Sequence, residues 1–171
     1  MSVVLIGYRG SGKSSIGRKL ADRLWQPFID TDEMVVKAAG KSIREIFEQE
    51  GEQRFRELEA QALREACAKQ EHVISVGGGA VLREENREVL RTSGHRIVYL
   101  RCEPQVLLQR IQSDPKTAES RPNLTGLGGG IEEIRSLLAQ REPLYREVMS
   151  FELDVTNLSV EDACVHITRV M

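Results

Sequence analysis

The sequence lacks the cysteine and histidine patterns of disulfide-bonded or zinc-binding proteins. Its three cysteines, Cys67, Cys102 and Cys164, lie far apart and form no CxxC pair. An odd number of cysteines without a pairing pattern is typical of free thiols in a reducing cytoplasm, which is the location we expect. The three histidines show no metal-ligand spacing, so we expect no zinc site.

Long apolar runs and an excess of basic residues are also missing. The apolar run at residues 2–6 has no basic flank and stops at Gly7, so we expect no signal peptide. No run approaches the roughly 20 apolar residues of a membrane helix. The formal net charge of −2 disfavours a nucleic-acid-binding protein. Because no exposed apolar pattern calls for a partner, we predict a monomer.

The 171 residues suit a single domain in which short apolar runs alternate with longer amphipathic stretches. This alternation predicts an α/β fold with a doubly wound, five-stranded parallel sheet flanked by helices. Residues 112–130 are polar and rich in Gly and Pro, and such a long irregular stretch is typical of a functional or disordered segment. The expected strands are 3–6, 27–30, 72–76, 96–100 and 151–155, and the expected helices are 13–24, 32–39, 42–50, 52–69, 83–92, 104–111, 131–149 (interrupted at Pro143) and 159–169.

The segment GYRGSGKS, residues 7–14, matches the P-loop pattern G-x-x-x-x-G-K-[ST] between a predicted strand and a predicted helix. Its glycines let main-chain N–H groups approach phosphate oxygens, and the helix directs its positive end at them. Lys13 can bridge the terminal phosphates, and the Ser14 hydroxyl can ligate Mg²⁺. A GTPase switch, an ATPase motor and a small-molecule kinase all remain open at this point. The nucleotide-binding residues that we expect are Gly10, Ser11, Gly12, Lys13, Ser14 and Ser15.

Two further segments follow predicted strands and should reach the same edge of the sheet as the P-loop. In FIDTDE, residues 28–33, Asp30 can hold a water on Mg²⁺. Asp32 can either accept a hydrogen bond from a substrate hydroxyl or merely cap the next helix, and the residues alone weigh these equally. In VGGGAV, residues 76–81, three consecutive glycines suggest close approach of a ligand or a nest of N–H groups, with a flexible turn as the alternative.

Three arginines are candidates for binding an anion, although an arginine taken alone is usually a solvated surface residue. Arg56 borders an apolar helical stripe, with Glu59 three residues later as a possible partner. Arg141 stands in REPLYR, and Arg121 in the irregular stretch.

Taken together, these segments resemble the shikimate kinase family over residues 3–169. The resemblance implies transfer of the γ-phosphoryl group of ATP to the 3-hydroxyl of shikimate, in the route to chorismate and the aromatic amino acids. It also implies a single P-loop kinase domain over residues 1–171, similar to nucleoside monophosphate kinases. A substrate-binding helical region would occupy about 32–61, and a lid about 112–130. The segments that carry the resemblance are GYRGSGKS, FIDTD, SIREIFEQEGEQRFRELE, VISVGGGAV, Arg121-Pro122 and REPLYR.

The resemblance also implies residue roles. Lys13 and Arg121 would stabilise the transferred phosphoryl group, and Arg110 would lie near the adenine. Ser14 would bind Mg²⁺ directly and Asp30 in its second shell. Asp32 would bind the shikimate hydroxyls and orient or deprotonate the attacking one. The substrate carboxylate would be held by Arg56, Arg141 and the backbone around Gly78 and Gly79. Gly77 would also belong to the substrate-binding residues.

One departure from the family pattern lies in the expected lid. The family usually shows RPLL, whereas this chain reads RPNL, so Asn123 replaces an apolar contact.

Competing functions have less support from the motifs. A related kinase for gluconate or a nucleoside monophosphate would leave the DTD, GGG and REPLYR segments without a reason. A non-catalytic nucleotide sensor is disfavoured by the intact Lys13, Ser14, Asp30 and Asp32. A GTPase switch is disfavoured because no NKxD-like guanine-reading motif is present.

Overall fold

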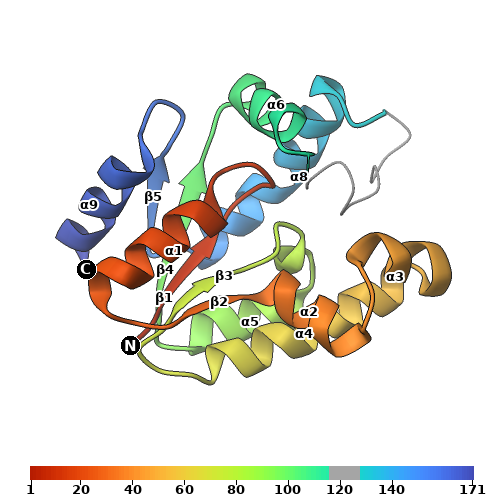
Figure 1. Ribbon diagram of the computed structural model, residues 1–171, viewed down its shortest axis with the longest axis horizontal. Coiled ribbons are helices and arrows are strands. Elements are labelled where there is room, and N and C mark those ends of the chain that lie inside the picture. Colours follow the sequence, from red (N-terminus) through yellow and green to blue (C-terminus); the bar gives the residue numbers. More distant parts are fainter. Residues whose placement is uncertain (116–127) are drawn as a thin grey trace.

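The computed structural model describes residues 1–115 and 128–171 and is built around a parallel β-sheet (Figure 1). Each hydrogen-bonded pair of strands is parallel, with β1 central between β3 and β4. This confirms the predicted five-stranded parallel sheet. The strands, in spatial order, are β2 (Phe28–Asp30), β3 (Val73–Ser75), β1 (Val3–Ile6), β4 (Arg96–Arg101) and β5 (Phe151–Asp154).

Helices connect the strands and cover both faces of the sheet (Figure 1). Within the described ranges the helices are α1 (Lys13–Leu24), α2 (Thr31–Ala39), α3 (Ile43–Glu50), α4 (Glu52–Cys67), the 3₁₀ helix η1 (Ala80–Leu82), α5 (Glu84–Thr92), α6 (Pro104–Ser113), α8 (Ile131–Val148) and α9 (Val160–Val170).

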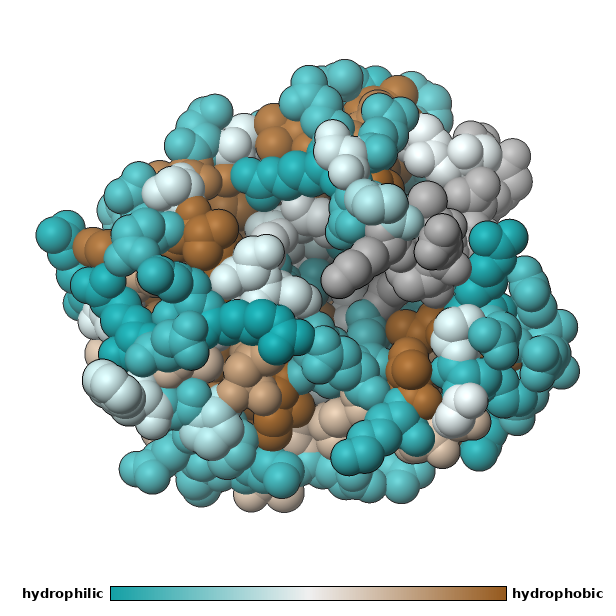
Figure 2. All heavy atoms as spheres, viewed as in Figure 1, coloured by the Kyte–Doolittle hydropathy of each residue, from teal (hydrophilic) through white to brown (hydrophobic). Residues whose placement is uncertain are grey.

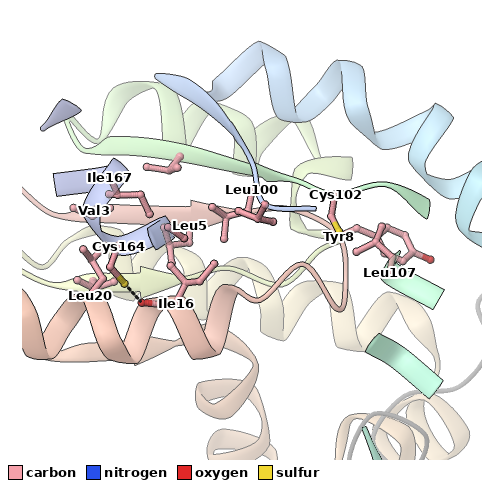
Figure 3. Packing of buried hydrophobic residues seen from close by; sticks show 14 of the residues in the cluster. Val3, Leu5, Tyr8, Ile16, Leu20, Leu100, Cys102, Leu107, Cys164 and Ile167 are labelled. Carbon is pink, nitrogen blue, oxygen red and sulfur yellow. Dashed lines mark hydrogen bonds between the residues drawn. The ribbon is translucent and has the colours of Figure 1, made fainter. Parts of the chain in front are cut away.

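Alternate residues of the central strand divide the core into two layers, because successive side chains of a strand point to opposite faces. Val3 and Leu5 of β1 pack on one face against α1, α6 and α9. Figure 3 shows this layer, in which the Cys164 thiol of α9 donates to the Ile16 carbonyl of α1 at 3.6 Å. Val4 and Ile6 pack on the other face against α4, α5 and α8. The chain is therefore doubly wound, as predicted.

A third apolar cluster joins α2, α3 and α4 beyond the end of β2. Val35, Ile46 and Phe55 form its centre and are almost completely buried. Ser42 caps α3: its hydroxyl accepts a hydrogen bond from the Glu45 N–H at 3.1 Å and also contacts the Glu45 carboxylate. This side-chain cap makes α3 begin at a defined residue.

Several element boundaries differ from the sequence-based expectations. α2 begins at Thr31, one residue early, because Asp30 caps it. η1 was not predicted, since three residues are too few to show a period. The expected interruption at Pro143 is wrong: α8 continues to Val148. Tyr145 and Val148 are buried beyond the proline, and their packing offsets the hydrogen bond that proline cannot donate.

The predicted irregular stretch is shorter at its start, because α6 continues to Ser113. Arg121, Pro122 and Asn123, which carry the expected lid, lie outside the described residues. The three cysteines are free and buried.

The described surface shown in Figure 2 is mainly hydrophilic, with hydrophobic residues in small separate patches. Of the helices that the structure describes, none combines the length and the apolar character needed to cross a membrane.

Candidate active site

A cleft of about 780 Å³ opens at the carboxyl ends of the strands. It is lined by the P-loop, by Asp30 and Asp32 after β2, and by Gly78 after β3. The three segments that the sequence predicts at one edge of the sheet therefore do converge. Arg110 and Asp114 from α6, together with Val155, Leu158, Ser159 and Val160 after β5, complete the described lining.

The P-loop connects β1 to α1. Gly10 and Gly12 have φ angles of 85° and 92°, a left-handed backbone that other residues adopt only at a cost. The Lys13 ammonium group folds back over the loop and donates to the carbonyl oxygens of Gly7 and Tyr8 at 2.7 and 3.0 Å. The loop is thus closed around its own lysine, which lies where a phosphate chain would be held.

Ser14 and Asp30 meet across the cleft. The Ser14 hydroxyl donates to Asp30 Oδ2 at 2.9 Å. The other oxygen of Asp30 accepts from the N–H groups of Asp32 and Glu33 at 2.9 and 3.4 Å, which caps α2. The alternative that Asp32 caps this helix is therefore wrong, and its side chain is free of that role.

Burial is the main cause that raises the pKa of Asp30, and the neighbouring charge of Asp32 raises this pKa further. The hydrogen bonds from Ser14 and from the backbone of Asp32 and Glu33 act in the opposite direction. Two carboxylates thus lie near each other at one wall of the cleft, and they repel each other unless a cation or a hydrogen-bond donor enters.

Arg56 and Arg141 are buried, with only 9% and 3% of their surface exposed, so the expectation of solvated arginines is wrong for both. Arg56 lies on α4 and donates to Glu59 Oε1 at 2.7 Å, as the spacing predicted. Its guanidinium also lies 5.2 Å from the centroid of the Phe55 ring. Because Glu59 is 1% exposed, Arg56 and Glu59 form a buried pair that holds the guanidinium in one orientation.

Arg141 comes from α8 and lies 5.6 Å from the centroid of the Tyr8 ring. Its guanidinium acts on the Tyr145 hydroxyl one turn further along the helix, where burial raises the pKa to about 12 and Arg141 opposes the rise. Within residues 1–115 and 128–171, Arg141 forms no ion pair, and its Nε is buried without a hydrogen-bond partner. A buried guanidinium in this state favours an anion.

The three glycines after β3 pass between these charged groups. A Cβ atom on Gly77 would lie 2.8 Å from Asp32 Oδ1 and 2.6 Å from Glu59 Oε2. A Cβ on Gly79 would overlap the Arg56 guanidinium, whose Nη2 lies 2.7 Å away. The glycines are therefore needed for close approach, and the interpretation as a plain flexible turn is wrong.

The remaining predicted residues occupy the nucleotide side. Arg110 donates to the Val155 carbonyl at 3.2 Å and to the Gly10 carbonyl at 3.5 Å, so it connects the P-loop to the loop after β5. Ser15 lines the cleft, whereas Ser11 is fully buried beneath the P-loop. Arg121 is not among the described residues.

Two residues at the site were not singled out from the sequence. Thr31, fully buried, accepts a hydrogen bond from the Gly77 N–H at 3.1 Å. Tyr145, also fully buried, donates to the Gly78 carbonyl at 2.6 Å. Both stand inside motifs that the sequence displays, DTD and REPLYR, and Tyr145 follows Arg141 by four residues. That helical spacing places the two side chains on one face of α8.

A P-loop, a carboxylate pair at its phosphate end and two buried arginines beside the glycines after β3 define a P-loop kinase that phosphorylates a small anionic acceptor. The family model of shikimate kinase matches residues 9–171. A shikimate kinase of Rhodopirellula baltica is 40% identical over 96% of this chain and 87% of its own length. The chain belongs to the shikimate kinase family.

Comparison with solved structures supports the same family assignment. The shikimate kinase of Acinetobacter baumannii, solved in complex with shikimate, superposes with a TM-score of 0.91 at 33% identity, covering 99% of this chain and 91% of its own. A gluconokinase of Sinorhizobium meliloti reaches a TM-score of 0.59 at 22% identity, with 99% and 92% coverage, which shows a shared fold alone.

Proposed function

We propose that this chain transfers the γ-phosphoryl group of ATP to the 3-hydroxyl of shikimate, giving shikimate 3-phosphate and ADP on the route to the aromatic amino acids. The observation that carries this proposal is the buried Arg141 guanidinium, which lies beside Gly78 of the cleft wall and has no acidic partner in the described part of the chain. A planar guanidinium binds a carboxylate through two parallel hydrogen bonds, and shikimate carries one carboxylate.

The acceptor carboxylate is held, in this proposal, by Arg56 and Arg141 together with the backbone of Gly78 and Gly79. The Arg56–Glu59 pair keeps its guanidinium from rotating, so the site is formed before the substrate arrives. Asp32 lies close to Gly77 and lines the same cleft, within reach of the hydroxyls of a substrate bound there. Asp32 then orients the attacking hydroxyl and accepts its hydrogen bond.

The nucleotide half supplies charge stabilisation, because phosphoryl transfer leaves little covalent chemistry to the protein. Lys13 exchanges its bonds to the Gly7 and Tyr8 carbonyls for bonds to the phosphates. Arg110 lies on the base side, between the P-loop and Val155.

The residues present also fit Mg²⁺. The Ser14 hydroxyl and the Asp30 carboxylate are 2.9 Å apart, and the repulsion between Asp30 and Asp32 would be relieved by a cation. Oxygen donors of this kind suit Mg²⁺, which binds through few protein ligands and keeps several waters. We propose that Ser14 ligates the ion directly and Asp30 through water. When bound, Mg²⁺ would neutralise the charge that develops on the phosphate oxygens.

An ADP-release assay tests this function. The purified chain receives ATP and Mg²⁺ with shikimate, gluconate or a nucleoside monophosphate in turn, and ATP alone serves as the control. We expect ADP release above the control with shikimate only. Equal release with gluconate, or none with shikimate, would refute the substrate assignment. A parallel titration of Mg²⁺ into EDTA-treated protein should restore the rate.

A further inference from the structure

In the described structure, hydrogen bonds engage every backbone carbonyl of residues 77–79, here called the glycine loop, but not every backbone N–H. Its three carbonyl oxygens are occupied: Gly77 accepts from the Ala80 N–H, Gly79 from the Leu82 N–H and Gly78 from the Tyr145 hydroxyl. The Gly77 N–H is occupied by Thr31. Among the described residues, none accepts a hydrogen bond from the N–H of Gly78 or Gly79. The loop therefore has two N–H groups without acceptors in the described part of the chain, while each of its carbonyl oxygens already accepts a hydrogen bond, and such donors suit an anion.

The orientation of the Gly78–Gly79 peptide decides whether the loop presents an N–H donor or a carbonyl oxygen to an anion. The Gly78 carbonyl and the Gly79 N–H belong to the same planar peptide and point in opposite directions. A peptide between two glycines meets little steric resistance to rotation. If it turned over, a carbonyl oxygen would face the substrate carboxylate, and the attraction would become repulsion.

Tyr145 opposes this rotation. Its hydroxyl donates to the Gly78 carbonyl at 2.6 Å, and its ring is fully buried and stacked on Tyr99 with centroids 4.9 Å apart. Rotation of the peptide would take the carbonyl acceptor away from the proton of the Tyr145 hydroxyl, which is unfavourable for buried groups even though Arg141 also acts on that hydroxyl.

We propose that Tyr145 is a positioning residue for acceptor binding: it holds the Gly78–Gly79 peptide so that the Gly79 N–H faces the substrate carboxylate beside Arg56 and Arg141. Thr31 holds the first peptide of the loop, Val76–Gly77, through the Gly77 N–H. The proposal rests on the assignment of the carboxylate site above and adds the residue that gives its backbone part the correct polarity.

The chain offers a matched pair of substitutions to test this role. Tyr145→Phe and Tyr99→Phe each remove one hydroxyl from the same ring stack. The Tyr99 hydroxyl donates to Glu142 at 3.2 Å and has no contact with the glycine loop. We expect Tyr145→Phe to raise KM for shikimate about fivefold to tenfold, the size of one lost buried hydrogen bond. KM for ATP should stay within about twofold in both variants, as should KM for shikimate in Tyr99→Phe, because these changes break no contact to those ligands.

A substrate analogue separates positioning from general damage. We would use shikimate with its carboxylate reduced to a primary alcohol, and compare kcat/KM of Tyr145→Phe with that of the parent. The deficit should fall to within about twofold, because the analogue brings no anion for the Gly79 N–H to bind. An unchanged deficit, or a rise in KM for shikimate equal to that in Tyr99→Phe, would overturn the proposal.

Shikimate binding by Arg141→Ala tests the carboxylate site itself. If that variant binds shikimate as the parent does, the proposed function fails. If it binds shikimate weakly while Tyr145→Phe has no effect, only the positioning role fails.

Discussion

The two halves of the cleft are built in different ways. The phosphate-binding part proposed for the nucleotide half is a single segment of eight residues that offers backbone N–H groups and one lysine. The acceptor half draws Arg56, Gly79, Tyr145 and Arg141 from three distant parts of the chain, and both arginines are buried. Phosphate binding by a helix end is a local property of the backbone, whereas a buried guanidinium depends on neighbours that only the fold supplies.

The two halves also differ in how far their charged and polar side chains are desolvated. Lys13 and Ser14 remain partly accessible and have partners nearby in the absence of nucleotide. Arg141, by contrast, is desolvated before its ligand arrives, which costs stability and prepares the site for a carboxylate. The arginines of the acceptor half are therefore more desolvated than Lys13 and Ser14.

Lys13→Ala should have the largest effect and separate the two halves most sharply. The ammonium group is the side-chain cation of the P-loop, and losing one preorganised charge-stabilising donor costs about 10² to 10³ in kcat. Shikimate binding, measured by calorimetry without nucleotide, should be unchanged, because the ammonium group of Lys13 donates to the P-loop carbonyls of Gly7 and Tyr8. An equal loss of shikimate affinity would mean that the halves are not independent.

Arg141→Ala should have the opposite pattern. Removing one partner of a desolvated charge pair costs roughly 2 to 5 kcal/mol, so KM for shikimate should rise about 30-fold or more, with KM for ATP little changed. Arg135→Ala is the control: it lies on the same helix, but its side chain is 60% exposed and paired only with Glu132. Parallel losses in ATP and shikimate binding would indicate damage to α8 rather than to the carboxylate site.

Gly79→Ala tests the close approach within the acceptor half. The added methyl group would meet the Arg56 guanidinium, which must move because the backbone cannot. Overpacking of this kind costs about 1 to 3 kcal/mol, so we expect KM for shikimate to rise about tenfold. The thermal midpoint should fall by about 2 to 4 °C for each kcal/mol of this cost, without added backbone strain, since the φ angle at Gly79 is −94° and suits alanine. Unchanged kinetics would show that Arg56 has room to spare.

The sequence predicted the fold in outline and the position of the P-loop between β1 and α1. Periodicity indicated β1, α1 and the parallel sheet, because the patterns of buried faces are local. It could not indicate that Arg56 and Arg141 are buried, since the burial of a charged side chain depends on distant elements such as the glycine loop. Tyr145 escaped notice for the same reason: its hydroxyl contact to Gly78 spans 67 residues. Arg121 and the lid stay predictions from sequence alone.

Asp30→Asn should have the smallest effect. The effect is on stability, and we expect this substitution to stabilise the ligand-free protein. Burial and the charge of Asp32 raise the pKa of Asp30 above its ordinary value of 3.8, so the folded state binds its proton more tightly than the unfolded state does. In the window between the two pKa values, stability falls as pH rises, and above the folded pKa the penalty is complete.

Asparagine keeps the helix cap without the charge. The thermal midpoint of the ligand-free variant at neutral pH should therefore exceed that of the parent, by about 2 to 4 °C for each kcal/mol gained. The gain should shrink as pH falls toward the unfolded pKa, while turnover with Mg²⁺ and ATP drops. A gain that does not vary with pH would show that the carboxylate pair is not its source, and a loss of stability at neutral pH would show that the cap matters more than the charge.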